Sequence, residues 1–244
     1  LIIMKVENKV WFVISSGIAP LYSEASFNSS CLTEMVYGDS CKILDNEDSW
    51  IFVELNDGYR GWVQSFYGFR SISKKKHAYI VAFPNENGFF HPKYPFGAKL
   101  MKKRPGSISV NVKINFDRIV DILTSLLGIP YKWAGKTTLG FDCSGLVQSV
   151  FQLYKINLPR NSSDQWHFLA NCKTNLNHCK KGDLHFFGKN GKISHVAISS
   201  GGLGFIHSQG YVKKESLDEK HPDFNQSLLD IYHSTASVRL KFSL

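Results

Sequence analysis

The spacing of apolar residues changes at Ile114, and this change divides the chain into two parts of different fold class. Before Ile114, apolar residues gather in short segments separated by polar turns, which is typical of small β-barrels. Asn56-Asp57-Gly58 is a strong hairpin signal, because these residues tolerate the left-handed backbone of tight turns. We therefore expect an SH3-sized barrel over residues 1–72, with strands at 10–14, 42–44, 50–55 and 59–63.

After Ile114 the apolar residues recur at helical spacing and later alternate again. The pattern predicts a helix over 116–127 capped by Asn115, and a second helix that begins after Asp142. Ser162 or Ser163 is the candidate cap of a short third helix. Strands follow at 184–187, 193–199 and 203–208. Helices followed by an antiparallel sheet indicate an α+β domain over residues 113–244.

Residues 73–112 separate these two parts and contain four prolines, which interrupt regular structure. A strand over 79–83 is the clearest element of this segment. We interpret it as a second, abbreviated SH3-like barrel or a β-rich extension of the first.

The chain of 244 residues carries 29 Lys and Arg against 20 Asp and Glu, a net charge of +9. This excess favours anionic partners such as nucleic acid, anionic lipid or an acidic cell-wall polymer. The basic clusters Lys74-Lys75-Lys76 and Lys102-Lys103-Arg104 are short, and no nucleic-acid-binding motif accompanies them. We interpret them as solvated surface charge and expect no nucleic-acid partner. No apolar run approaches the ~18 residues of a membrane-spanning helix, so we expect no membrane span.

The five cysteines are an odd number, so at least one has no partner within the chain. Cys172, His178, Cys179 and His185 lie close in sequence, but their spacing fits no common zinc pattern. We therefore expect neither a metal ion nor another cofactor.

Cys143 follows Gly140-Phe141-Asp142 at the start of the second predicted helix. The N-terminus of a helix carries partial positive charge and free N–H donors. These conditions lower the pKa of a thiol, and the same donors stabilise a developing oxyanion. A buried structural cysteine is the commoner role of a single Cys, so Cys143 alone does not establish a nucleophile.

Two histidines favour the catalytic interpretation. If the hairpin closes on Gly201, Ala197 pairs with Phe205 and His195 pairs with His207. Directly opposed side chains share one face of a sheet, with Cβ atoms about 5 Å apart. A general base needs such a partner to fix its tautomer and its ring orientation. A Cys-His-His peptidase site therefore explains these residues better than a coincidental surface pair.

The segment around Cys143 reads Asp142-Cys143-Ser144-Gly145-Leu146-Val147, and further matching segments lie on both sides of it. They are Tyr131-Lys132-Trp133-Ala134-Gly135, Leu158-Pro159-Arg160, Gly182-Asp183-Leu184-His185-Phe186-Phe187, Ser194-His195-Val196-Ala197-Ile198 and Phe205-Ile206-His207. Together they resemble the NlpC-type cysteine peptidases, which have a papain-like fold. Gly58-Tyr59-Arg60-Gly61-Trp62-Val63 resembles the bacterial SH3-like domains often attached to them.

The resemblance implies a role for each matching residue. Cys143 is the expected nucleophile, His195 the base, and His207 the residue that orients His195. Tyr131 is expected beside the nucleophile, where it assists the oxyanion. The remaining candidates are expected to hold the substrate: Asp142, Ser144, Arg160 and Ser162 or Ser163 at the γ-D-Glu portion, and Tyr59 from the barrel at its far end.

The implied reaction is hydrolysis of the bond between γ-D-Glu and a diamino acid, meso-diaminopimelate or lysine, in peptidoglycan stem peptides. Two positions depart from relatives that require a free L-Ala amine: Asn161 and Ser30 stand where those relatives carry acids. We therefore expect a weak requirement for that amine, unless Glu24 or Glu34 reaches the same place.

Two other functions remain open at this point: an amidase or transpeptidase on the same scaffold, and a non-catalytic wall-binding protein. The expected partner is peptidoglycan or its muropeptide fragments, and the chain is expected to act as a monomer. The expected location is bacterial, either the cytoplasm or the periplasm and cell envelope.

Overall fold

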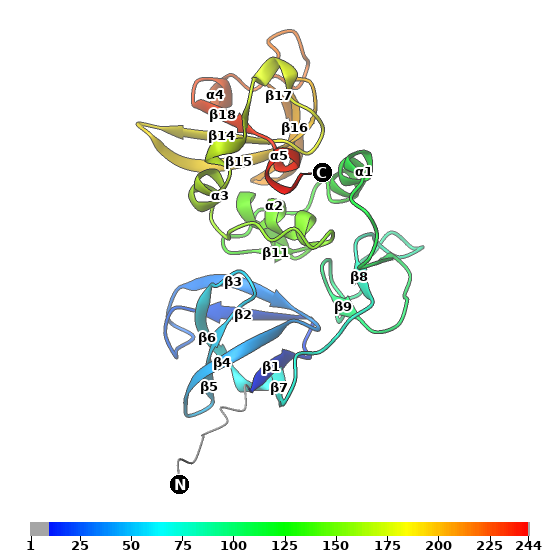
Figure 1. Ribbon diagram of the computed structural model, residues 1–244, viewed down its shortest axis with the longest axis vertical. Helices are drawn as coiled ribbons and strands as arrows, with labels where there is room; N and C mark the ends of the chain where they lie inside the picture. The colour runs from blue at the N-terminus through cyan, green and yellow to red at the C-terminus, as the bar shows by residue number, and fades with distance from the viewer. Residues whose placement is uncertain (1–9, 244) are drawn as a thin grey trace.

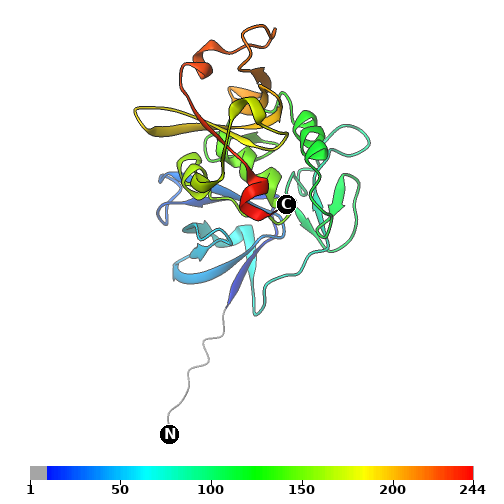
Figure 2. The ribbon, with the colours of Figure 1, turned by 45° about the horizontal axis from the view of Figure 1, so that its top comes forward.

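The computed structural model describes residues 10–243, so residues 1–9 of the predicted first domain and Leu244 lie outside the described part. Figure 1 shows a barrel in blue and cyan, a small sheet beside it, and a mixed helical and sheet domain in green to red. The helix α2 (Cys143–Gln152) lies between the barrel and the large sheet of the mixed domain. The turned view in Figure 2 keeps the same arrangement.

The barrel is a seven-stranded antiparallel sheet in the order β3-β2-β6-β5-β4-β1-β7. Its apolar core includes Phe12, Leu21, Val53 and Val63, each almost fully buried. The strands are β1 (Trp11–Ile14), β2 (Ile18–Tyr22), β3 (Cys31–Val36), β4 (Ser40–Glu47), β5 (Trp50–Glu54), β6 (Arg60–Gln64) and β7 (Gly68–Ser71), with a 3-10 turn at Ser65–Tyr67.

The strand predicted over 42–44 is too short, because β4 continues to Glu47. Asp45, Asn46 and Glu47 pair with Phe52, Ile51 and Trp50 of β5. Pairing with an apolar neighbouring strand thus outweighs the turn preference of these polar residues. The chain reverses only at Asp48, whose φ of 50° is left-handed.

Residues 79–109 form a three-stranded sheet in the order β10-β8-β9. Its strands are β8 (Tyr79–Val81), β9 (Lys99–Leu100) and β10 (Ser107–Ser109). Ile80 and Phe96 belong to the same apolar core as the helices that follow. The ring of Phe96 meets Phe141 edge to face, with centroids 5.8 Å apart. This segment is therefore packed onto the second half of the chain.

The second half is an α+β domain with a six-stranded sheet in the order β13-β18-β14-β15-β16-β17. Its helices are α1 (Phe116–Ser125), α2 (Cys143–Gln152), α3 (Ser162–Phe168), α4 (Gln226–Leu229) and α5 (Val238–Phe242). Its strands are β11 (Lys136–Thr137), β12 (Gly140–Phe141), β13 (Lys173–Thr174), β14 (Leu184–Lys189), β15 (Lys192–Gly201), β16 (Gly204–Gln209), β17 (Tyr211–Ser216) and β18 (Tyr232–Ala236), and 3-10 turns lie at Ala170–Cys172 and Leu176–His178.

The predicted helix starts agree with the structure at two of three places. Asn115 accepts a hydrogen bond from the backbone of Arg118 at 3.0 Å, and Asp142 accepts one from Gly145 at 2.6 Å. At the third helix the cap is Asn161, and neither Ser162 nor Ser163 has that position, because both are already helical. Asn161 makes no side-chain capping bond.

The barrel is joined to the α+β domain by polar side chains of β3. The carboxylate of Glu34 forms an ion pair with Lys132 and accepts hydrogen bonds from the backbone of Lys136 at 3.0 Å and the hydroxyl of Thr137 at 3.4 Å. The side chain of Glu34 is only 1% exposed. A buried carboxylate is stable there because three donors share it.

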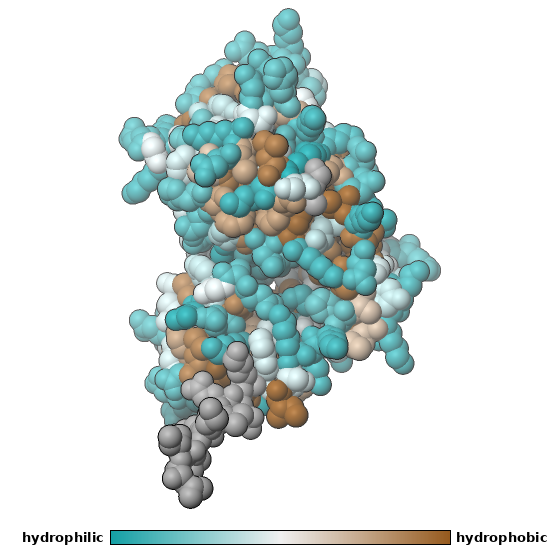
Figure 3. Space-filling view, viewed as in Figure 1, coloured by the Kyte–Doolittle hydropathy of each residue, from teal (hydrophilic) through white to brown (hydrophobic). Residues whose placement is uncertain are grey.

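Most of the face shown in Figure 3 is hydrophilic, with separate apolar patches on the barrel and on the α+β domain. None of the helices within residues 10–243 has both the length and the apolar character that crossing a bilayer requires.

We predict that Glu34→Ala lowers the free energy of unfolding by about 2 kcal/mol or more, because it removes a buried acceptor shared by three donors. Glu54→Ala is the matched control, since Glu54 pairs with the exposed Arg60 and such surface pairs contribute ~1 kcal/mol or less. Chemical denaturation of both variants measures the difference. Equal losses in the two variants would contradict a stabilising role for the Glu34 cluster.

Candidate functional site

The start of α2 is held by a buried polar network around Cys143. Asp142 caps the helix through Gly145, and Cys143 is the first helical residue, 8% exposed. Gly145 has no room for a side chain, because a Cβ there would lie 2.2 Å from the carbonyl oxygen of Gly135. The glycine in the Asp142-Cys143-Ser144-Gly145 segment therefore lets the loop before the helix pack against it.

Burial raises the pKa of the Cys143 thiol to about 11, and the charge of Asp142 acts in the same direction. Hydrogen bonds from the backbone at Val196 and Ser144 oppose this change without reversing it. The prediction of a lowered pKa is therefore wrong for the free protein, because the helix N-terminus is outweighed by burial. At neutral pH the thiol is protonated, so its activation requires a base.

His195 on β15 and His207 on β16 are the predicted base and its predicted partner. Nε2 of His195 lies 2.7 Å from Nδ1 of His207. The predicted register is wrong, because Ile198 pairs with Ile206 and Ser199 with Phe205. An irregularity between Ser199 and Gly201 moves the reversal toward Gly202 and displaces the register by two residues. The imidazoles still share a face, as diagonal neighbours.

Glu215 on β17 follows His195 and His207 in a line of three polar side chains. Glu215 was not predicted from the sequence. Its Oε2 lies 2.9 Å from Nε2 of His207. An ionised carboxylate only accepts hydrogen bonds, so Nε2 of a neutral His207 carries the proton and Nδ1 accepts. Nε2 of His195 then donates to His207, and Nδ1 of His195 keeps a free lone pair. Glu215 thus selects the tautomer in which His195 accepts a proton at Nδ1.

The charge of Glu215 is preserved by its neighbours. Burial would raise the pKa of Glu215, but hydrogen bonds from His207, Lys213 and Asn225 outweigh burial and lower it to about 2. Lys213 lies 2.8 Å from Oε1, and Asn225 donates to Oε2 at 2.6 Å. The carboxylate therefore stays ionised throughout the neutral range.

Counting residue pairs across the hairpin of β16 and β17 could have identified Glu215 from the sequence. The turn at Gly210 pairs Gln209 with Tyr211 and His207 with Lys213. Glu215 lies two residues beyond Lys213, on the same face as His207. It is the nearest carboxylate in sequence on that face, which is a signal available without a structure.

Arg160 connects the start of α2 to the barrel. Its guanidinium donates to both carboxylate oxygens of Asp142 at 3.0 and 2.5 Å, and to the hydroxyls of Ser144 at 3.1 Å and Thr33 at 2.8 Å. These bonds use four of its five N–H donors. Asp142, Ser144 and Arg160 are therefore brought together as predicted, and one donor of Arg160 remains.

Two adjoining clefts of about 400 and 340 Å³ meet at Cys143 and Tyr131. The first is lined by Asp142, Ser144, Arg160, Asn161 and Ser162, with Leu32 from the barrel, and the second by His195 and residues of β16. Burial raises the pKa of Tyr131 to about 12, with Cys143 and Asp142 contributing, so its hydroxyl stays protonated as a donor.

Two predicted substrate-binding residues, Ser163 and Tyr59, are not among the cleft-lining residues, and neither is Ser30. His207 also lies outside both linings, behind His195. Tyr59 packs against the barrel core. Burial lowers the pKa of the Arg160 guanidinium, but Asp142 and, to a smaller extent, the nearby Tyr59 raise it. Glu34 is engaged with Lys132, and Glu24 is also absent from the lining. The barrel residue that reaches the cleft is Leu32.

No group of three or more His, Cys, Asp or Glu within residues 10–243 is arranged to hold a metal ion. Cys179 donates to the carbonyl of Gly202 at 2.5 Å, and His185 lies 2.8 Å from the hydroxyl of Thr235. These residues of the unusual Cys and His cluster therefore have protein partners.

Family comparisons match both parts of the chain. The profile of the NlpC/P60 family matches residues 128–229, and that of the bacterial dipeptidyl-peptidase SH3 domain matches residues 21–65. The chain is 26% identical over 214 residues to a gamma-D-glutamyl-L-lysine dipeptidyl-peptidase of Bacillus subtilis, covering 72% of this chain and 71% of the relative. It is 24% identical to dipeptidyl-peptidase 6 of Lysinibacillus sphaericus, covering 88% and 95% of the two chains.

Among solved structures, an NlpC/P60 endopeptidase from Photobacterium damselae subsp. piscicida matches with a TM-score of 0.65 and 13% identity. The match covers 95% of this chain and 72% of that one. At this identity the likeness concerns the fold. It extends over the barrel and the α+β domain together.

We predict that Glu215 sets the imidazole tautomers. Nitrogen-15 spectra of the neutral protein should show His195 and His207 each protonated at Nε2, since each donates from that atom. Glu215→Ala removes the acceptor and should give a mixture of tautomers. Glu219→Ala, at an exposed position, is the control. Unchanged tautomers in Glu215→Ala would contradict the role of the carboxylate.

Proposed function

Because this chain belongs to the NlpC/P60 family of cysteine peptidases, we propose that it cleaves the bond between γ-D-glutamate and a diamino acid in peptidoglycan stem peptides. The observation that carries the proposal is the line from His195 through His207 to Glu215, directed at the cleft that contains Cys143. The name of the relative from Bacillus subtilis, a gamma-D-glutamyl-L-lysine dipeptidyl-peptidase, supports this bond with lysine as the diamino acid. We propose lysine or meso-diaminopimelate for this chain.

In the proposed reaction, Nδ1 of His195 takes the thiol proton as Sγ of Cys143 attacks the amide carbon. The new imidazolium is stabilised through His207 by the charge of Glu215. The oxyanion receives hydrogen bonds from the backbone N–H of Cys143, at the start of α2, and from the hydroxyl of Tyr131.

The tetrahedral intermediate then collapses and the C–N bond breaks. His195 returns the proton to the leaving amine of the diamino acid, which leaves a thioester on Cys143. Water loses a proton to His195, attacks the thioester and releases the γ-D-glutamyl product with the free thiol. The proton and the thiol are restored at the end of the cycle, so no co-reactant is consumed.

The γ-D-glutamyl part is assigned to the cleft beside α2. Its free carboxylate would accept from the remaining N–H of Arg160 and from the hydroxyl of Ser162. Ser144 lies beside them, donating to Asp142 and accepting from Arg160. Arg160 therefore acts mainly by positioning Asp142 and Ser144. We propose that the enzyme acts as a monomer on peptidoglycan or its fragments.

We predict that Cys143→Ala abolishes cleavage of L-Ala-γ-D-Glu-L-Lys, because the nucleophile is gone. Cys172→Ala is the matched control, since Cys172 is equally buried and absent from the clefts. Mass spectrometry should show L-Ala-γ-D-Glu and free lysine. Products joined to an added amine would indicate a transpeptidase, and turnover of Cys143→Ala above a few per cent would refute the nucleophile.

We predict that kcat/KM decreases on the acid side only at pH values well below 6.5. Burial, His207 and Lys213 lower the pKa of His195 to about 3, against the opposing charge of Glu215, so the neutral base persists in mild acid. Glu215→Gln should lower this pKa further, moving the limb to lower pH while kcat falls. A limb near pH 6.5, or a shift to higher pH in Glu215→Gln, would contradict the assignment.

The two histidines should respond differently to substitution. We predict that His195→Ala is nearly inactive because the proton acceptor is lost. His207→Gln should keep part of the activity, since an amide oxygen still accepts from Nε2 of His195. Steady-state rates on the same tripeptide provide the measurement. Equal loss in both variants would mean that His207 does more than orient its neighbour.

We predict that a free L-Ala amine is preferred over an acetylated one by tenfold or less, equivalent to about 1.4 kcal/mol. Asp142 is the only carboxylate that lines the cleft within the described residues, and Arg160 neutralises it. Asn161→Asp should strengthen the preference, and Ser163→Asp, outside the lining, is the control. A thousandfold preference in the unmutated enzyme would show that another charged acceptor reaches the amine.

A further inference from the structure

The two basic clusters of the sequence converge on one cavity away from Cys143. Lys75 and Lys76 lie in the segment that follows the barrel, and Lys102 and Arg104 lie after β9. All four line a cavity of about 420 Å³ between the barrel and the three-stranded sheet. None of its lining residues belongs to either cleft at Cys143. The fold therefore gathers these charges around one hollow, and all four residues remain exposed, in agreement with the interpretation of solvated surface charge.

The positive charge of this basic cavity is not compensated locally. No Asp or Glu is among its described lining residues. Lys99, which also lines it, forms an ion pair with Asp39 outside the lining. None of the ion pairs within residues 10–243 involves Lys75, Lys102 or Arg104. Like charges facing one hollow destabilise the free protein slightly and favour an anionic ligand.

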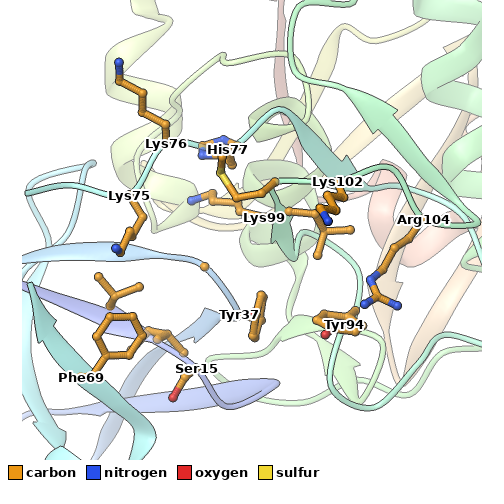
Figure 4. Close-up of a pocket in the computed structure, with 15 residues that line it drawn as sticks. Ser15, Tyr37, Phe69, Lys75, Lys76, His77, Tyr94, Lys99, Lys102 and Arg104 are labelled. Carbon is orange, nitrogen blue, oxygen red and sulfur yellow. The ribbon is translucent and has the colours of Figure 1, made fainter.

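Three aromatic side chains, Tyr37, Phe69 and Tyr94, line the cavity together with aliphatic and basic residues. Tyr37 and Tyr94 meet edge to face with centroids 4.9 Å apart, and Arg104 stacks on Tyr94 at 4.4 Å. Figure 4 shows Lys75 extending toward Phe69, while Lys76 points away from the hollow. Phe69 remains 46% exposed. A ring held against these side chains would place its charged substituent near the basic rim.

We propose that this basic cavity binds an acidic saccharide unit of the cell wall, with its ring against Tyr37 and Phe69 and its carboxylate or phosphate at Lys75 and Lys102. The volume lies within the range of small-ligand pockets, about 300–1,000 Å³. A cavity of this size takes one or two sugar units. A nucleic-acid strand instead requires an extended groove with successive backbone contacts.

The proposal is independent of the peptidase reaction and adds a second contact to the wall. Binding is measured by calorimetry on the full chain carrying Cys143→Ala, so that no probe is cleaved. The probes are N-acetylmuramic acid, N-acetylglucosamine 6-phosphate, neutral N-acetylglucosamine and a single-stranded oligothymidylate. We expect the acidic sugars to bind at least tenfold more tightly than the neutral one, and the preferred acid identifies a carboxylate or phosphate source.

The double variant Lys75→Glu/Lys102→Glu should weaken binding of the acidic sugar at least tenfold. Lys74→Glu/Lys103→Glu is the matched control, because it makes the same charge change in the same two clusters outside the lining. Its affinity should change less than threefold. Equal losses in both double variants would overturn the site in favour of a general charge effect.

Two further results would overturn the proposal: equal binding of acidic and neutral sugars, and tighter binding of the oligothymidylate through Lys75 and Lys102. Lys75→Ala/Lys102→Ala repeats the test without charge reversal if the glutamate variant fails to fold. Cleavage of L-Ala-γ-D-Glu-L-Lys by chains that retain Cys143 is measured separately. It should be unchanged in these variants, so failure of the saccharide site does not decide the peptidase function.

Discussion

The buried ion pair between Asp142 and Arg160 fixes the geometry on which the rest of the site depends. Asp142 caps α2 and so places Cys143, while Arg160 also binds Ser144 and reaches Thr33 of the barrel. A buried pair of this kind is costly to break, because either partner alone would be an uncompensated charge. The helix start, the floor of the cleft and the position of the barrel are therefore coupled through one guanidinium.

The site uses two carboxylates for opposite electrostatic purposes. Asp142 beside the thiol raises the pKa of Cys143 and is itself neutralised by Arg160, whereas Glu215 lies at the far end of the histidine pair. In the proposed reaction, proton transfer from Cys143 to His195 moves positive charge toward Glu215 and away from Asp142. The two carboxylates lie at opposite ends of the site. In the resting protein the thiol of Cys143 and the imidazole of His195 are therefore both neutral. When the thiolate and imidazolium form, Glu215 stabilises the imidazolium.

Local patterns were sufficient to predict the helix caps at Asn115 and Asp142, since each cap depends on residues three positions apart. The hairpin also placed His195 and His207 on neighbouring strands, although not in the observed register. The register failed because an irregularity beside Gly201 has no clear signature in a sequence with two adjacent glycines. The pKa of Cys143 depends on burial in the assembled fold, which no local pattern contains. The bond from Arg160 to Thr33 joins residues in separate domains, so sequence spacing carries no information about it.

Strand β3 connects the basic cavity to the proposed peptidase site. Leu32 lines the cleft at Cys143, Thr33 and Glu34 bind the α+β domain, and Tyr37, just beyond the strand, lines the basic cavity. Five residues of extended chain span roughly 17 Å. The residue that lines the cleft and the residue that lines the basic cavity are thus about one strand length apart. Because Glu34 and Thr33 are buried between these ends, a shift of β3 at one site would be resisted by the same contacts that hold the other.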